Sequence, residues 1–266
     1  MTIYVPGKVT LRQTWQPMDP DAAAYITAVE TADGQALEEK VKIAIDNFVL
    51  GCKADGIWNA IKASCILAGA RTLSGALVSL KGTAPTNFNF VSGDYDRKTG
   101  LISDGSTKYL DSNRNNNADP QNDQHLSVYV TQAGSVFPNV YIGAGGLSAS
   151  GATHFGSNTS TNVIFFRNRS NTALDHSTAN SGTLGSIGMS RSSSSSYIAR
   201  AEGLNNSFSQ SSQTPYNSNV SVFWRTGSTG YSDGRLAFYS IGESLDLARL
   251  DARVTDLINA IGVAIP

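Results

Sequence analysis

Two stretches decide the class of fold: HLSVYVTQ at residues 125–132 and VSVFWRT at residues 220–226. Both alternate apolar and polar residues, which is typical of β-strands that bury one face. Further short β-rich runs recur between clusters of Gly, Asn, Ser and Asp, at 76–80, 88–91, 139–143, 163–167, 197–202 and 235–241. Many short strands separated by turn residues indicate a sandwich or a barrel. Of the two, we predict one two-layer antiparallel sandwich for residues 71–243.

Helical patterns precede this region, and residues 19–70 are predicted to form a small helical unit. Asp19 is a candidate N-cap with Pro20 at the first helical position, and Gly34 ends this first helix. A second helix carries apolar residues at three- and four-residue spacing from 37 to 49 and is expected to end at Gly51. A third, short helix is expected to carry Ile57, Trp58, Ile61 and Ile66.

A further helix is predicted at the C-terminus, within residues 244–266. Residues 245–262 form one apolar stripe, with Ser244 as candidate N-cap and Gly262 as the expected stop. The stripe is too short for a sustained coiled coil. It is expected to pack against the N-terminal helices or against its own copies in an oligomer.

Residues 1–18 are predicted to be an extended N-terminal arm. Ile3, Val5, Val9 and Leu11 alternate with polar residues, which is the period of a strand. Such a strand either forms an edge of its own domain or docks by adding to a partner's sheet. The second reading makes these four residues the predicted docking residues.

Composition excludes several classes. Hydrophobic residues are 40% of the 266, enough for a core, and the net charge of −1 lacks the basicity of a nucleic-acid binder. The chain contains 33 Ser and 20 Asn, and the first serine is Ser64, which suggests a boundary between modules. No run of about 18 apolar residues exists, so no membrane insertion is expected. The N-terminus also lacks the pattern of a signal peptide.

Three segments carry a resemblance. DGSTKYLDSN at 104–113, HLSVYVTQ and the segment from 220 to 245 resemble the laminin-G-like, concanavalin-like lectin sandwich. Residues 51–101 together with LDARVTDLINAIG at 250–262 are similar to virion proteins of tailed bacteriophages, including cyanophages. The resemblance covers roughly residues 20–262 and implies a jelly-roll-like sandwich on a phage particle.

The resemblance leaves the role on the particle open. One role is a fibre or spike adhesin that displays the lectin-like domain to host-surface glycan. The other is a capsid decoration or head-fibre protein attached to the major capsid protein. Either role implies virion localisation, other virion proteins as partners and, by the habit of phage fibres, a homotrimer. A free lectin or a glycan-cleaving enzyme is the third and least favoured alternative.

No catalytic constellation stands out, so the protein is predicted not to be an enzyme. GYSDG at 230–234 matches the G-x-S-x-G pattern, but that elbow needs a following helix and a later histidine. Here RLAFYSI follows, which reads as a strand, and the last histidine is His176, so GYSDG is read as a hairpin turn. His125, His154 and His176 lack metal spacing and are expected at the surface or in loops. Cys52 and Cys65, both placed in the helical segment, are either buried hydrophobes or a disulfide.

Two groups of residues are candidates for binding. Alternating Asp and Asn residues make weak calcium candidates of Asp111, Asn113, Asn115 and Asp119, although the fixed Gly and closing Glu of a calcium loop are missing. The alternative is an Asx-rich solvated turn. No other cofactor is expected. For a glycan, the loop tyrosines Tyr216 and Tyr231 are the better candidates, since Trp224 shares a strand face with two valines and either face could be the core.

Overall fold

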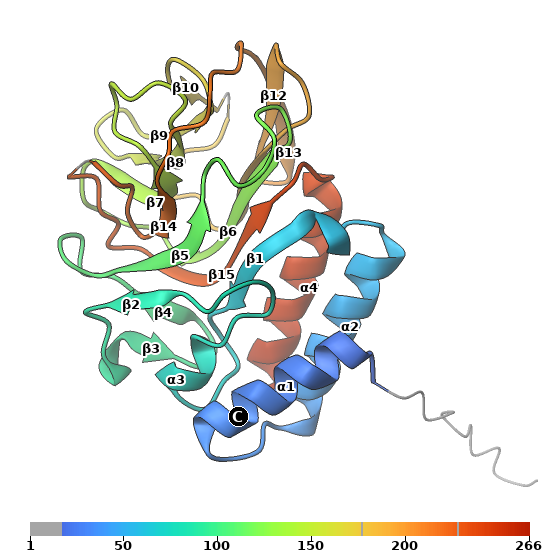
Figure 1. Ribbon diagram of the computed structural model, residues 1–266. Helices are drawn as coiled ribbons and strands as arrows, with labels where there is room; N and C mark the ends of the chain where they lie inside the picture. The colour runs from blue at the N-terminus through green and yellow to red at the C-terminus, as the bar shows by residue number, and fades with distance from the viewer. Residues whose placement is uncertain (1–17, 177, 228) are drawn as a thin grey trace, which may run out of the picture.

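Two antiparallel sheets pack face to face, and a layer of helices covers the outer face of one of them (Figure 1). The computed structural model describes residues 18–176, 178–227 and 229–266. The first sheet, sheet A, runs in the order β13 (Leu204–Ser209), β12 (Ser196–Ala201), β11 (Gly185–Arg191), β6 (Gln124–Gln132), β15 (Arg235–Gly242), β4 (Gly100–Ile102) and β3 (Tyr95–Asp96), with β1 (Ile61–Ile66) also paired to β15.

Sheet B runs in the order β10 (Leu174–Asp175), β9 (Val163–Asn168), β8 (Thr153–Asn158), β7 (Asn139–Ala144), β14 (Asn219–Val222), β5 (Tyr109–Asn115) and β2 (Thr86–Phe88). Alternate residues of both sheets fill the space between them, among them Val128 and Ile187 of sheet A and Ile142 and Phe155 of sheet B. The predicted two-layer antiparallel sandwich is confirmed. Strands β3, β4, β8, β10, β11 and β13 were missing from the sequence prediction, and β5 lies only in the segment that carries the resemblance.

The helical layer consists of α1 (Pro20–Asp33), α2 (Glu39–Ala54) and α4 (Leu247–Ala264). The predicted cap Asp19 accepts from the backbone N–H of Asp21, and Gly34 ends α1 in the left-handed conformation. Three predicted helix boundaries were wrong, those at Gly51, Gly262 and Ser244: α2 and α4 continue past both glycines, and Asp246 caps α4.

The apolar stripe of α4 packs on α2 and on sheet A, as one of the two predicted arrangements requires. Leu250, Val254 and Leu257 share one buried cluster with Phe48 of α2 and Phe238 of β15. The stripe is thus covered within the chain itself. It therefore gives no support to an oligomer formed through α4.

Residues 61–66 were predicted to be helical and instead form β1, which pairs with the last strand, β15. Only a 3-10 turn, η1 (Trp58–Ala60), precedes it. Ala63 and Cys65 face the sandwich while Ile61 and Ile66 face the helices. A strand buried on both faces has no alternation, so its sequence cannot be distinguished from a buried helix by period alone.

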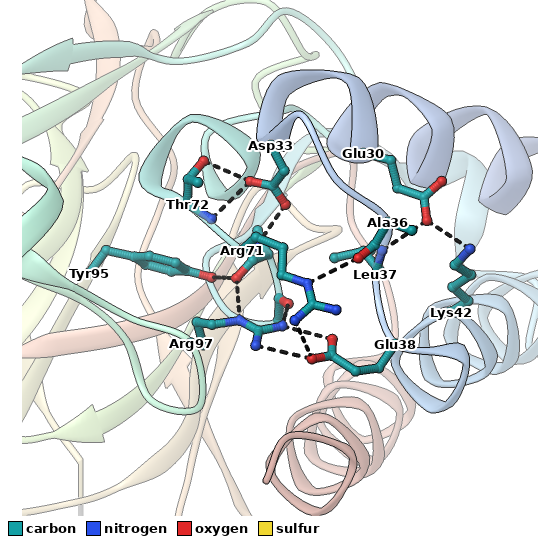
Figure 2. A network of polar contacts seen from close by, with 12 residues as sticks. Glu30, Asp33, Ala36, Leu37, Glu38, Lys42, Arg71, Thr72, Tyr95 and Arg97 are labelled. Carbon is teal, nitrogen blue, oxygen red and sulfur yellow. Dashed lines mark hydrogen bonds and ion pairs between the residues drawn. The ribbon is translucent and has the colours of Figure 1, made fainter.

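The run at 76–80 was predicted to be a strand and instead begins in α3 (Leu73–Ala76). Thr72 caps this helix by accepting from Gly75, and Asp33 at the end of α1 accepts from the backbone N–H of Arg71 and of Thr72 (Figure 2). The same carboxylate also accepts from the Thr72 hydroxyl. A contact with α1 therefore fixes the conformation of this segment.

A polar network joins the helical layer to sheet A (Figure 2). Glu38, just before α2, accepts from both terminal nitrogens of Arg97, at 3.1 and 2.7 Å, and lies 2.7 Å from Arg71. Arg97 also donates to the carbonyls of Ala70 and Gly69, and Tyr95 donates to Ala70. The predicted boundary near residue 70 is therefore crossed by ion pairs as well as by a shared core.

The predicted docking residues Ile3, Val5, Val9 and Leu11 lie outside the described residues. Within the described part of the chain, no helix combines the length and the apolar character needed to cross a membrane.

Candidate functional site

Four aromatic rings form a continuous row on the outer side of sheet B, at its β2 edge. Phe88 stacks on Tyr109 with ring centroids 4.3 Å apart and planes at 5°. Tyr109 contacts Trp224 at 4.7 Å, and Trp224 stacks on Tyr231 at 5.3 Å and 13°. Phe88 is 36% exposed, and the other three rings are partly exposed. This aromatic ladder is the set Phe88, Tyr109, Trp224 and Tyr231.

The backbone at Phe223 turns Trp224 outward. Strict alternation after Val220 and Val222 would place Trp224 in the sandwich core. Phe223 has φ +69°, a left-handed conformation that interrupts the alternation, and its backbone N–H donates to Tyr141. Val222 and Phe223 are consequently both fully buried, and Trp224 leaves the core for the surface.

A polar row lies beside the ladder. The strand register aligns Thr86 of β2, Asp111 of β5 and Ser221 of β14, and Asp111 follows Tyr109 by two residues, so both side chains lie on one face. Asp111 accepts from the backbone N–H of Asn113 at 2.8 Å and from the side-chain amide of Asn219 at 3.2 Å. Rings flanked by a carboxylate and amides can contact the apolar face of a ligand and bind its hydroxyls at once.

Burial raises the pKa of the Tyr109 phenol, and the neighbouring Tyr231 and Asp111 raise it further. The phenol is therefore a neutral hydrogen-bond donor at ordinary pH. The ladder consequently presents this neutral phenol two residues along β5 from the Asp111 side chain.

The two predicted glycan tyrosines are separated by the structure. Tyr231 belongs to the ladder and forms a single antiparallel bridge with Trp224. The ring of Tyr216 instead packs over the backbone of Gly145, and its backbone N–H donates to Gly151. Tyr216 thus holds a loop. Phe88 was missed by the sequence analysis because only the pairing of β2 with β5 brings it beside Tyr109.

The four calcium candidates do not form one ligand set. Asp119 is 6% exposed and forms an ion pair with Arg114, whereas Asp111 is bound by Asn113 and Asn219. Asn115 accepts from the backbone N–H of Asn117, as expected of an Asx turn. Across residues 18–176, 178–227 and 229–266, no cluster of three or more His, Cys, Asp or Glu side chains is placed to hold a metal.

All three histidines are buried, so the expected surface position was wrong. His154 lies in β8 instead of a loop, whereas His176 lies in a loop as predicted and His125 lies at the start of β6. His125 donates through Nδ1 to the Glu243 carbonyl at 2.6 Å and accepts at Nε2 from the Ser240 hydroxyl at 2.7 Å. His154 accepts from Arg225 at 2.8 Å. Burial lowers the pKa of each imidazole, so all three are neutral parts of the interior.

Four arginines that the sequence did not single out are also buried: Arg167, Arg169, Arg191 and Arg225. Arg167 donates to the carbonyls of Leu147, Ala149 and Ser170. Arg169 and Arg191 likewise donate to loop carbonyls. Arg167, Arg169 and Arg191 therefore fasten loops that connect strands of the two sheets.

The GYSDG segment is not a nucleophile elbow. The strand β15 follows it, and the Ser232 hydroxyl is fully buried and accepts from the backbone N–H of Gly234. The segment belongs to the connection by which the chain passes from β14 in sheet B to β15 in sheet A. Cys52 and Cys65 are free and buried, so the disulfide alternative is wrong.

Several solved structures are similar to this chain. The binding domain of botulinum neurotoxin serotype D matches with a TM-score of 0.53 and 8% identity, over 77% of this chain and 52% of that chain. Trypanosoma rangeli sialidase matches at 0.49 and 9%, over 90% and 38%. Domain 4 of a Geobacillus stearothermophilus arabinanase, solved with arabinotriose, matches at 0.41 and 13%, over 67% and 82%.

This chain spans about half the length of the botulinum domain, 52% of it. At 8% identity, the likeness establishes the β-sandwich fold alone. No family model matches the chain, and no match was found among curated proteins. These solved structures are not phage proteins, so membership in the phage virion group stays a prediction.

Proposed function

We propose that this protein is a glycan-binding adhesin and that the aromatic ladder is its binding surface. The observation that carries the proposal is the juxtaposition of four partly exposed rings with the neighbouring polar side chains of Thr86 and Asp111. A saccharide has apolar C–H faces and outward hydroxyls, which such a surface contacts together. The fold shared with a toxin binding domain is compatible with this role.

We further propose that the protein is a fibre or spike protein on the surface of a tailed-phage particle, as the sequence resemblance implies. Capsid decoration is the alternative role. Labelling virions with antibody to this protein and locating the label by electron microscopy distinguishes tail from capsid. Light scattering of the purified chain tests the trimer, which is part of the same proposal.

Binding is tested on a glycan array with Trp224→Ala. Trp224 contacts both Tyr109 and Tyr231, so removing it takes the largest ring out of the ladder. Binding to any glycan recognised by the wild type should then weaken at least about tenfold, equal to 1.4 kcal/mol. Phe137→Ala is the matched control because Phe137 is an exposed ring, 61% accessible, outside the ladder. Equal binding by wild type and Trp224→Ala would exclude the ladder as the site.

A further inference from the structure

A shallow apolar groove runs between α2 and α4 on the outer surface of the helical layer. Its volume is about 380 Å³, and its lining residues are Lys40, Ile43, Ala44, Asn47, Asn259, Ala260, Val263 and Ala264. A second hollow of about 190 Å³ shares Ala44, Asn47 and Ala260 with it and extends the groove toward Asp256. The seam between the two helices is therefore hollowed over several turns.

The groove exposes aliphatic side chains that α2 and α4 do not cover. Val263 is 82% exposed and Ile43 is 48% exposed. Leu50, about two turns beyond Ile43 on α2 and outside the lining, is 45% exposed. Neighbouring exposed aliphatic residues in a concave surface favour an apolar occupant.

The end of the described chain lies close to this groove. Met18 packs against the same cluster that holds α2 and α4 together. The backbone N–H of Asp19 donates to Asp46 Oδ1 at 2.8 Å, and Asp46 lies about one helical turn from Ile43. The described chain therefore begins beside α2.

The length and pattern of residues 1–17 match the groove. Six residues separate Leu11 from Met18 and can span about 20 Å when extended. The groove begins about one turn away and is two helices wide, with axes about 8–10 Å apart. In an extended segment Val9 and Leu11 point to the same side, about 7 Å apart. Because residues 9–11 are covalently attached to the same chain, their effective concentration at the groove is about millimolar, so even a weak contact is enough to keep the groove occupied.

We propose that the α2–α4 groove is the seat of residues 9–11 of the same chain, with Val9 and Leu11 against Ile43 and Val263. The proposal is independent of glycan binding. It has a consequence for assembly, because Val9 and Leu11 are also predicted docking residues. The free chain keeps them covered until a partner surface takes them.

Disulfide trapping tests the proposal on the full-length chain. The trapping variant combines Leu11→Cys with Ala260→Cys in the groove. The matched control combines Leu11→Cys with Ala28→Cys, because Ala28 is likewise exposed and lies on α1, about 12 Å along the helix from Pro20 and outside the groove. The native thiols do not compete, since Cys52 and Cys65 are buried.

Under mild oxidation, the disulfide of the trapping variant (the groove pair) should form at least tenfold faster than that of the matched control (the control pair). The product should run as a monomer on a non-reducing gel. Adding Val263→Asp should reduce the rate to that of the control, while circular dichroism stays unchanged. Equal rates for the two pairs would overturn the proposal, as would a rate insensitive to Val263→Asp. Disulfide-linked dimers from the groove pair would assign the groove to a second copy instead.

Discussion

Replacing Glu38 by Gln should measurably weaken the attachment of the helical layer to sheet A. Glu38 makes three contacts with arginine nitrogens, two with Arg97 at 3.1 and 2.7 Å and one with Arg71 at 2.7 Å. The three side chains are only 21–26% exposed, so water screens the contacts less than it screens an open surface pair. An exposed pair contributes about 0–1 kcal/mol and a hydrogen bond to a charged group about 1.5–3 kcal/mol. We expect Glu38→Gln to lower the free energy of unfolding by about 1.5–3 kcal/mol at pH 7.

The pH dependence gives the same prediction a second readout. Hydrogen bonds from Arg97 hold the pKa of Glu38 below its ordinary value of 4.5, with further help from Arg71. The folded chain therefore releases this proton more readily than the unfolded chain. The stabilisation is complete above pH 4.5 and is lost as the pH falls through the lower folded value. The gap between wild type and Glu38→Gln should accordingly shrink below pH 4.5.

Urea unfolding at pH 7 and at pH 3.5 measures both effects. Glu39→Gln is the matched control, because Glu39 begins α2 and shares the helix-dipole contribution but is exposed. It should change the free energy of unfolding by about 0.3–1 kcal/mol. A loss no larger for Glu38→Gln than for Glu39→Gln, or a gap unchanged at pH 3.5, would refute the reasoning.

Three further outcomes are expected. Burial lowers the pKa of His125 to about 4. The contribution of the neutral His125 side chain to the free energy of unfolding is therefore complete above pH 6.5 and falls by up to about 1.4 kcal/mol per pH unit toward pH 4. His125→Asn should flatten this pH dependence when the free energy of unfolding is measured by urea titration. Burial raises the pKa of the Cys52 and Cys65 thiols to about 12, so neither should react with a thiol reagent until the chain is unfolded, as a colorimetric thiol assay will show. Arg167→Met should cost at least about 2 kcal/mol in urea unfolding, because one buried carbonyl and two partly buried carbonyls lose their donor, whereas a loss below 1 kcal/mol would contradict the role of Arg167 in fastening the loops.

The sequence pattern was sufficient to predict an element wherever the burial of its residues follows a regular period along that element. The alternation of 125–132 was enough to predict β6, since β6 buries one face in the sandwich and the other faces the helices. The cap at Asp19 and the stop at Gly34 depend on neighbours within one turn, so they too were predictable. For the same reason two antiparallel layers flanked by helices followed from the sequence alone.

Contacts between distant segments decided the rest. Residues 61–66 became a strand because β15, near the other end of the chain, offered them a pairing edge. The histidines became buried because strands and loops close over them, which polarity in sequence does not reveal. The candidate site depended most on tertiary structure: the left-handed turn at Phe223 moves Trp224 to the surface, and the register of β2 with β5 adds Phe88. Sequence supplied the aromatic residues, but a single backbone angle and a strand register, both set by packing, placed them in one row.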